Sequence, residues 1–347
     1  MMDKKFISVI RWYHKQIFSF EKEQNYHMLP LEVMQEQWYT CEIFAIDAQV
    51  KIEDDPNFVP WVHVVYYKNI FQYLRYLRRN RKSIIYANSI TIKTLLVWMI
   101  GKRTVFYPHA YIFWSSMLKR LIIRFFYRFF TRVRVNNSAE FSAVNTIKKW
   151  LAYILPLAVS EYFLVNDENK QRSNGIFIGN LTPIKNPEFL IDTCMLLKQK
   201  KIPFTIIIVG EDRYCKQGKT FKDLVHAFGL DAYFHFLGFV PHRDIKPYLA
   251  QSLLYINTSH SEGQCLAVYE AALAGCHLCL PNILAFPSVF GTNALYHATP
   301  QILAHNIISV LNHPIHEHRV HNQQLILEKY TYANIKQGTK DLFINHL

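Results

Sequence analysis

One stretch of the second half, residues 253–280, constrains the fold more than any other part of the chain. Its first residues, Leu253–Asn257, form a short apolar run with the length and aliphatic content of a buried strand. A polar loop follows, and Leu266–Leu273 then carries helix-forming residues with apolar side chains three and four positions apart. Gly275 stands where this helix should end, and His277–Leu280 begins another apolar strand. The order strand, loop, helix, strand predicts one unit of a parallel α/β sheet.

Two acids of this unit, Glu262 in the loop and Glu270 in the helix, are placed to share one site. Their spacing is close to a multiple of 3.6, so both can face the crevice at the carboxyl ends of the strands, where open α/β sheets bind ligands. The backbone N–H groups after Gly263 lack partners within the helix and would form an anion site there. Carboxylates accept hydrogen bonds from hydroxyl groups, so the unit predicts a nucleotide-sugar pocket. The competing interpretation is that Glu262 caps the helix and Glu270 is a solvated acid.

The distribution of charge indicates two domains. The chain has 347 residues and a net charge of +13, and residues 1–160 hold 23 Lys/Arg against 11 Asp/Glu. This length exceeds the usual single core, and strands alternate with helices along both halves. We therefore predict two doubly wound α/β domains, residues 1–160 and residues 161–347, of which the first carries nearly all of the positive charge.

The first half contains a long segment without acids. From Pro56 to Ala139 there are 15 Lys/Arg and no Asp/Glu. Within it, Trp114–Arg134 predicts an apolar helix with arginines at every fourth position, which would form one stripe: Arg120, Arg124, Arg128 and Arg132. Such a helix can pack one side on a sheet and present arginines and aromatic rings to an anionic bilayer. A second group of bases could extend this face: Arg75, Arg78, Arg79, Arg81 and Lys82. Two alternatives stay open, a solvated basic face and a nucleic-acid site, for which no recognition motif is present.

Cysteine usage and the lengths of the apolar runs bear on the compartment. The six cysteines are scattered among apolar neighbours, which indicates reduced thiols in a cytoplasm. The spacing of Cys276 and Cys279 is that of a metal or redox pair, but the pair falls in a predicted core strand without a second ligand pair, so we expect it to fill the core. No apolar run approaches the length of a membrane span, and Phe6–Ile10 is too short for a secretory signal. We expect a cytoplasmic protein that is peripheral at the inner face of the membrane.

Several motifs of the second half resemble glycosyltransferase family 4, the retaining transferases of GT-B fold. This chain has residues that resemble the donor-site signature of that family: Ser259, Glu262-Gly263, Glu270-Ala271 and Ala274-Gly275. A second set of residues resembles the family's segment around the donor diphosphate: Ile178-Gly179-Asn180-Leu181 followed by Lys185-Asn186. The resemblance implies a GT-B fold, in which two Rossmann-like domains face each other across a cleft and the last helix crosses back onto the first domain.

The resemblance also implies roles for individual residues in donor binding. Lys185 would neutralise the donor diphosphate beside Gly179 and Asn180. Asn180 stands where arginine is usual, so one positive charge is missing there. Glu270 would hold the ribose hydroxyls. Phe239 would stack on the base, although filling the core is an equal alternative for this side chain.

Two further residues would act on the transferred sugar. Glu262 would hold it and favour the positive charge that develops at the anomeric carbon. His109 follows a predicted strand, Thr104–Tyr107, and would lie near the same sugar.

These inferences predict a retaining glycosyltransferase of hexosyltransferase type. It would move a sugar from a nucleotide-diphosphate sugar to a glycan or lipid-linked acceptor, in bacterial surface polysaccharide or glycolipid synthesis. No Asp-x-Asp motif occurs, so we expect no metal or other cofactor, and we expect no nucleic-acid partner. Two alternatives stay open: a non-catalytic GT-B relative that serves binding or assembly, which the missing arginine favours, and a nucleic-acid binder.

Overall fold

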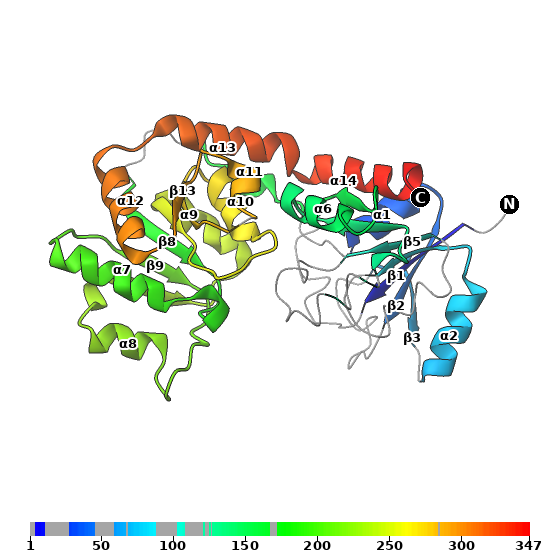
Figure 1. Cartoon of the computed structure of the whole chain (residues 1–347), viewed down its shortest axis with the longest axis horizontal. Coiled ribbons are helices and arrows are strands. Elements are labelled where there is room, and N and C mark those ends of the chain that lie inside the picture. The colour runs from blue at the N-terminus through cyan, green and yellow to red at the C-terminus, as the bar shows by residue number, and fades with distance from the viewer. Residues whose placement is uncertain are drawn as a thin grey trace. The chain divides into compact units, whose positions relative to one another are not determined.

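A computed structural model describes residues 4–10, 28–45, 59–66, 69–87, 103–107, 121, 125, 127–166, 172–283 and 285–347. The chain divides into two compact units (Figure 1). Unit 1 comprises Met1–Ala158 together with Tyr330–Leu347, and unit 2 comprises Val159–Lys329. The C-terminal segment therefore packs in the unit that begins the chain.

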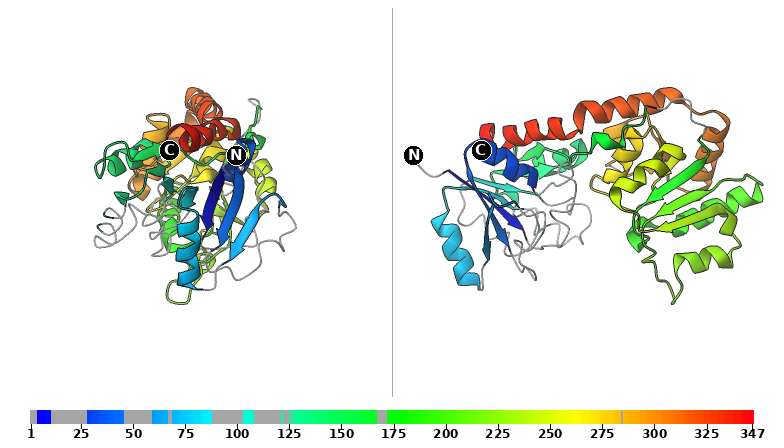
Figure 2. Two further views of the ribbon diagram at one scale, coloured as in Figure 1. Left: turned by 90° about the vertical axis from the view of Figure 1, so that its right-hand side faces the viewer. Right: turned by 180° about the vertical axis from the view of Figure 1, so that it is seen from behind.

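Unit 1 is built on a seven-stranded parallel sheet in the order β3-β2-β1-β4-β5-β6-β7. Its strands are β1 (Lys5–Ile10), β2 (Thr40–Ala45), β3 (His63–Tyr66), β4 (Ile84–Ala87), β5 (Arg103–Phe106), β6 (Arg132–Val135) and β7 (Ala152–Ile154). The central strands are apolar on both faces because helices cover both. Helices α1 (Met28–Glu36) and α14 (Tyr332–Lys340) share one core with one face of the sheet, and α2 (Ile70–Arg79) packs on the other (Figure 2).

The C-terminal segment is an integral part of the core of unit 1. Phe343, in the π-helical turn Asp341–Asn345 that follows α14, is fully buried and meets the ring of Phe6 edge-on at 5.0 Å. Tyr332 donates a hydrogen bond to Glu32 of α1 at 2.5 Å. Apolar burial and these contacts hold α14 against α1.

Unit 2 is built on a six-stranded parallel sheet in the order β10-β9-β8-β11-β12-β13. Its strands are β8 (Asn174–Ile178), β9 (Ile206–Val209), β10 (Phe234–Gly238), β11 (Ser252–Ile256), β12 (His277–Pro281) and β13 (Leu295–His297). Its α-helices are α7 (Glu188–Gln199), α8 (Phe221–Ala227), α9 (Lys246–Gln251), α10 (Leu266–Leu273), α11 (Pro287–Phe290), α12 (Pro300–Asn312) and α13 (His316–Lys329). The doubly wound parallel architecture predicted from the sequence is confirmed in both units.

The predicted strand–loop–helix–strand unit is confirmed as β11, α10 and β12. Gly275 ends the helix with φ +74°, a left-handed conformation that glycine adopts without the steric penalty of a Cβ. Because β8 lies next to β11 in the sheet, the carboxyl ends of these two strands adjoin.

The predicted arginine stripe is wrong at its C-terminal end. The backbone at Phe125 and Tyr127 is helical, but Arg128 lies in a turn and Arg132 is the first residue of β6. Arg132 therefore cannot continue a helical stripe. The sequence Arg132–Val135 alternates basic and β-branched residues, a period of two that suits a strand. Arg120 and Arg124 lie outside the described residues, and contact of these arginines with a membrane stays a prediction.

Arg134, the third residue of β6, is buried, with 1% of its surface exposed. Its guanidinium donates to the carbonyls of Leu155 and Pro156 at 2.6 and 2.8 Å and to the hydroxyl of Tyr86 at 2.8 Å. It also lies over the ring of Tyr107, at 4.6 Å from the centroid. These contacts give Arg134 a structural role, since a buried charge needs hydrogen-bond partners.

Candidate functional site

The loop between β11 and α10 starts from a fixed residue, Asn257, which is 2% exposed. Its backbone N–H donates to the carbonyl of Cys279 at 3.0 Å, and its Oδ1 accepts from the N–H of Ser259 at 2.9 Å. His297 places Nε2 at 3.0 Å from the carbonyl of Asn257. Burial lowers the pKa of His297 to about 4, so this imidazole is neutral at pH 7 and donates the hydrogen bond.

The carboxylate of Glu262 is the centre of a polar cluster in this loop. Its Oε1 accepts from Lys185 Nζ at 2.5 Å and from Ser259 Oγ at 2.6 Å. A longer contact joins the same oxygen to Asn257 Nδ2 at 3.4 Å. Burial alone would lower the pKa of Lys185, but the neighbouring Cys265 and Glu262 side chains outweigh burial and raise it. Lys185 therefore stays charged beside a carboxylate whose position is fixed by several donors.

Lys185 is brought to Glu262 by the segment that follows β8. This segment is the 3-10 turn Pro183–Lys185, and two hydrogen bonds tie it to the loop of Glu262. Thr258 Oγ1 donates to the carbonyl of Lys185 at 2.8 Å, and the N–H of His260 donates to the carbonyl of Ile184 at 2.9 Å. The two loops thus form one platform at the adjoining ends of β8 and β11.

Gly179 and Asn180 continue from the end of β8 toward the same platform. The backbone approaches closely here, since a Cβ placed on Gly210 would overlap the carbonyl of Gly179. A Cβ on Gly179 itself would stand 3.5 Å from Cε of Lys185. The Oδ1 of Asn180 accepts from the N–H of Glu211 at 2.9 Å, so this side chain fastens the loop to the end of β9. Arginine has no acceptor and cannot make that bond.

Glu270 lies in α10 with 3% of its surface exposed, and its Oε1 stands 2.8 Å from Nε2 of His242. His242 opens the 3-10 turn His242–Ile245, and its ring meets Phe163 edge-on at 4.8 Å. The interpretation of Glu270 as a solvated acid is therefore wrong. Sequence reasoning missed His242 because its contact with Glu270 joins two segments 28 positions apart, which local periodicity does not relate. The available signal was a histidine just after a predicted strand end.

The beginning of α10 was expected to offer backbone N–H groups to an anion. The helix begins at Leu266, and Cys265 is its N-cap, with φ +52° and no hydrogen bond from its side chain to the helix N–H groups. Glu262 is thus not the cap of this helix, which contradicts the capping interpretation. Gly263 is half-buried between the Glu262 cluster and this helix end. Burial, followed by the charge of Glu262, raises the pKa of the Cys265 thiol to about 12, so the thiol stays neutral.

Phe239 directly follows β10 and is 68% exposed. The alternative that it fills the core is therefore wrong, and its ring is open to a flat partner. Thus Lys185 contacts Glu262 directly with Gly179 and Asn180 beside them, while Glu270 pairs with His242. His109, the remaining predicted residue, lies outside the described residues.

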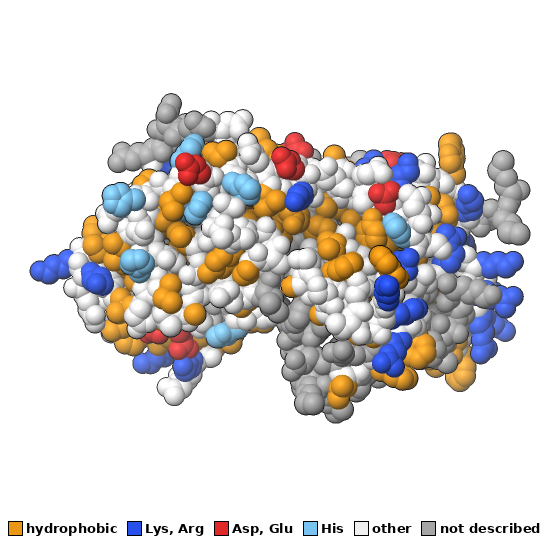
Figure 3. Space-filling view, turned by 45° about the horizontal axis from the view of Figure 1, so that its top comes forward, with side chains coloured by type: hydrophobic (Ala, Val, Ile, Leu, Met, Phe, Trp, Pro, Cys, Tyr) orange, Lys and Arg blue, Asp and Glu red, His pale blue; other side chains and the backbone are white. Residues whose placement is uncertain are grey.

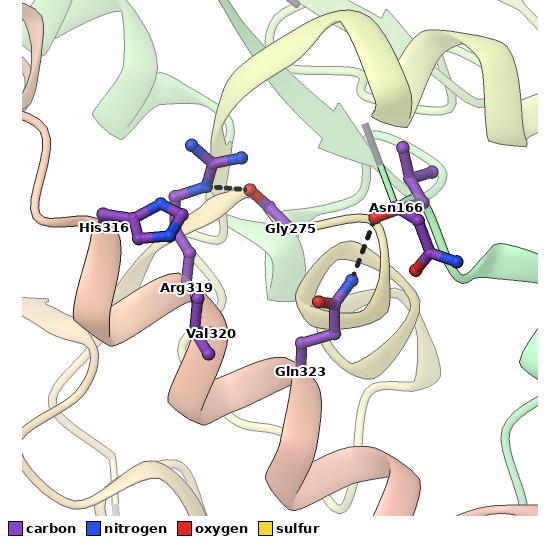
Figure 4. A pocket seen from close by; sticks show the side chains of 7 residues that line it. Asn166, Gly275, His316, Arg319, Val320 and Gln323 are labelled. Carbon is purple, nitrogen blue, oxygen red and sulfur yellow. Dashed lines mark hydrogen bonds between the residues drawn. The ribbon is translucent and has the colours of Figure 1, made fainter. Parts of the chain in front are cut away.

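A separate cavity of about 110 Å³ lies beyond the C-terminal end of α10 (Figure 4). Arg319 of α13 donates from Nε to the carbonyl of Gly275 at 2.5 Å. Gln323 of the same helix donates to the carbonyls of Leu273 and Val165, at 2.6 and 3.1 Å. These side chains satisfy carbonyl groups that a helix leaves open at its end, so we assign this cavity a structural role.

The described parts of the chain hold no cluster of metal ligands and no membrane-spanning helix. No group of three or more His, Cys, Asp or Glu side chains in these parts is placed to hold a metal ion. Cys276 and Cys279 are both fully buried, as expected for core residues. Nor does any helix within the described ranges combine the length and apolarity needed to cross a bilayer.

The two doubly wound units match solved structures over nearly the whole chain. Anabaena Alr3699/HepE in complex with UDP-glucose aligns with a TM-score of 0.73, at 18% identity, covering 98% of this chain and 99% of that one. WaaG, a glycosyltransferase involved in lipopolysaccharide biosynthesis, aligns with a TM-score of 0.69, at 11% identity, covering 98% and 99%. These matches define the fold as GT-B, as the sequence predicted.

The sequence of unit 2 is similar to one family of glycosyl transferases. Residues 160–324 match the family model Glycosyl transferases group 1. A stretch of 118 residues is 29% identical to the tRNA-queuosine alpha-mannosyltransferase of Drosophila melanogaster. That stretch covers 33% of this chain and 30% of the length of that relative.

Proposed function

We propose that this protein is a glycosyltransferase that takes its sugar from a nucleotide-diphosphate sugar bound in unit 2. The observation that carries the proposal is the pairing of Lys185 with Glu262 at 2.5 Å, beside the close backbone approach of Gly179 and Gly210. A charged lysine next to an open glycine backbone suits a diphosphate. The match of residues 160–324 to group 1 glycosyl transferases, and the UDP-glucose in the complex of Alr3699/HepE, support this class of donor.

In this proposal each polar side chain of unit 2 acts on a different part of the donor. Lys185 binds the diphosphate and stabilises the charge that grows on it as it leaves, which is usually the largest contribution to such catalysis. Glu262 is oriented by Ser259 and Lys185 to hold the sugar and to favour positive charge at the anomeric carbon. Glu270 accepts hydrogen bonds from the ribose, and Phe239 stacks on the base.

The reaction we propose retains the anomeric configuration. The bond between the anomeric carbon and the phosphate oxygen breaks, and a bond from the acceptor oxygen to that carbon forms on the same face. The acceptor proton passes to the leaving phosphate. A double displacement would instead need a carboxylate nucleophile on the far face of the sugar, a role that the proposal assigns to no residue. The chain has no Asp-x-Asp motif, so we expect the reaction to need no metal.

For the acceptor we propose a glycan or a lipid-linked glycan, with a hexose as the transferred sugar. The role in lipopolysaccharide biosynthesis given for WaaG supports an acceptor of this kind and a place in bacterial surface polysaccharide or glycolipid synthesis. The excess of positive charge in residues 1–160 suits a protein that works at the cytoplasmic face of a membrane.

A non-catalytic binding protein is the second candidate, because Asn180 leaves the donor site one positive charge short. Incubation with a panel of nucleotide sugars and isolated glycolipids, followed by NMR of the product, tests both candidates. We expect release of a nucleoside diphosphate and a product with the donor's anomeric configuration. Tight donor binding without any turnover would support the second candidate, and an inverted product would contradict the retaining mechanism.

A further inference from the structure

The outward face of α2 in unit 1 carries an exposed aromatic ring among exposed basic side chains. Phe71 is 79% exposed, although a phenylalanine on a folded protein is usually buried. Arg75 and Arg78 follow it at the fourth and seventh positions, and both are exposed. Residues at these spacings share one face of a helix, so the ring and the two guanidinium groups lie side by side.

The opposite face of α2 is fully used by the core, which fixes the orientation of the helix. Tyr73 and Leu77 are both 0% exposed, and Phe44 of β2 packs against Tyr73 at 5.3 Å between ring centroids. The hydroxyl of Tyr76 donates to Glu42. Because its opposite face packs in the core, α2 keeps this face directed outward from the core of unit 1.

The basic side chains of this face have no acidic partners among the residues that the structure describes. No ion pair or hydrogen bond joins Arg75, Arg78 or Arg79 to another described side chain. Arg81 and Lys82, in the turn after the helix, are also exposed. The sequence from Pro56 to Ala139 contains no Asp or Glu that could neutralise them locally. Figure 3 shows Lys and Arg side chains gathered along the edge of the molecule on which α2 lies in Figure 1.

An open groove of about 760 Å³ runs along the same face. Apolar side chains, Phe71 and Leu74, line it together with the arginines Arg75, Arg78 and Arg79. Ile70, which is 37% exposed, adds aliphatic surface at the start of the helix. The lining of the groove therefore combines apolar side chains with positively charged ones.

We propose that this face of α2 docks unit 1 on an anionic lipid surface. Phe71 and Ile70 enter the boundary between headgroups and acyl chains, and the arginines bind lipid phosphates. The charge complementarity of five exposed bases, none of them paired with an acid among the described residues, favours an anionic surface over a neutral one. The aliphatic side chains of Ile70 and Leu74 favour a bilayer over a single-stranded nucleic acid, because, of the three apolar side chains on this face, it is the ring of Phe71 on which a base could stack.

The test is co-sedimentation of the full chain with vesicles of phosphatidylcholine alone and of phosphatidylcholine with 30 mol% phosphatidylglycerol. We expect binding to the anionic vesicles, weakening with added salt, and at least tenfold weaker binding to the neutral ones. Arg78→Gln with Arg79→Gln should weaken anionic binding by about tenfold or more, because each base near such a surface contributes about a factor of five. Phe71→Ser should weaken it severalfold and leave the dependence on salt in place.

The chain offers a matched control in Lys200 and Lys201, an adjacent exposed pair in unit 2. Lys200→Gln with Lys201→Gln changes the net charge equally and should leave vesicle binding unchanged. Equal loss in the two double variants, or equal binding to neutral and anionic vesicles, would overturn the proposal. Binding of single-stranded RNA that depends on Arg78 and Arg79, without vesicle binding, would also overturn it and assign the face to nucleic acid. Nucleoside diphosphate affinity, which belongs to unit 2, should be the same in all variants, so this outcome is independent of the proposed donor site.

Discussion

Asn180 combines two properties that separate the proposed donor site from the arginine-containing pattern that its motifs resemble. It adds no positive charge beside Lys185, and its Oδ1 holds the N–H of Glu211 at 2.9 Å. We predict that Asn180→Arg binds a nucleoside diphosphate up to about tenfold more tightly at low salt, with the gain lost at high salt. It should also lower the free energy of unfolding by about 1 kcal/mol, since the bond to Glu211 is lost.

Calorimetric titration at low and high salt, together with urea denaturation, measures both effects. Asn180→Ala is the control, because it removes the hydrogen bond without adding charge. If Asn180→Arg and Asn180→Ala bind the nucleotide equally, position 180 does not face the diphosphate.

Glu270 is predicted to bind the donor ribose, and its contact with His242 makes the prediction testable at two positions. Glu270→Ala should weaken nucleotide binding by about 1.5–3 kcal/mol, the contribution of a hydrogen bond to a charged group. His242→Gln keeps a donor toward Glu270 and should cost much less. Calorimetric titration measures the nucleotide affinity of the two variants. If Glu270→Ala binds the nucleotide as tightly as wild type, Glu270 does not contact it.

Sequence spacing predicted the site residues of single elements, but it could not predict which of them make contact. Glu262 and Glu270 were singled out from local pattern, because loop and helix positions follow from short-range periodicity. The contact between Lys185 and Glu262 depends on β8 lying next to β11, which is a property of strand order. The contact of Glu270 with His242 also joins segments far apart in the sequence, so His242 was missed.

At the scale of elements, the loop after β8 depends on the close approach of Gly210. A Cβ at this position would overlap the carbonyl of Gly179, so Gly210→Ala should displace the loop that carries Asn180. We predict a loss of about 2 kcal/mol or more in stability, together with weaker nucleotide binding. Gly218→Ala is a matched control, because Gly218 also has positive φ, +75°, but no atom within 4 Å of the added Cβ. If urea denaturation shows similar losses of stability in the two variants, backbone strain alone would explain the effect.

Elements with a strong apolar period were predicted well, and those with mixed patterns were not. The strand and helix limits around α10 agree closely with the sequence prediction, because the apolar positions there repeat cleanly. The segment Trp114–Arg134 was predicted as one helix, although it ends in strand β6. Its basic and apolar residues fit periods of both two and 3.6, and only pairing with β5 and β7 selects the strand. The polar helix α13 has a weak apolar period and was not predicted at all.

At the scale of the whole molecule, two buried histidines make the stability of unit 2 depend on pH. Burial, with the nearby Arg319 charge as a smaller cause, lowers the pKa of His277 to about 3, and burial lowers that of His297 to about 4. The unfolded chain, with an ordinary histidine pKa near 6.5, then binds more protons than the folded chain between about pH 4 and 6.5. The contribution of these two neutral histidines to the free energy of unfolding is therefore complete above pH 6.5 and is lost as the pH falls.

We predict a decrease in the free energy of unfolding of up to about 1.4 kcal/mol per pH unit for each of these histidines below pH 6.5. Urea denaturation of wild type at pH 7.5, 6.0 and 5.0 measures the slope. The double variant His277→Gln with His297→Gln should have a lower stability at pH 7.5 but a flatter slope. Equal slopes in the two proteins would show that other groups cause the acid sensitivity.

The central element of the proposed function is the binding of a nucleoside diphosphate by Lys185 in unit 2. Isothermal titration of UDP, GDP and ADP into wild type and Lys185→Gln measures this directly, with thermal unfolding to verify that the variant is folded. We predict that wild type binds at least one of the three, and that Lys185→Gln binds it at least about tenfold more weakly, because a charge-assisted contact is lost. Binding of equal strength in the two proteins, or of none of the three nucleotides by wild type, would contradict the account.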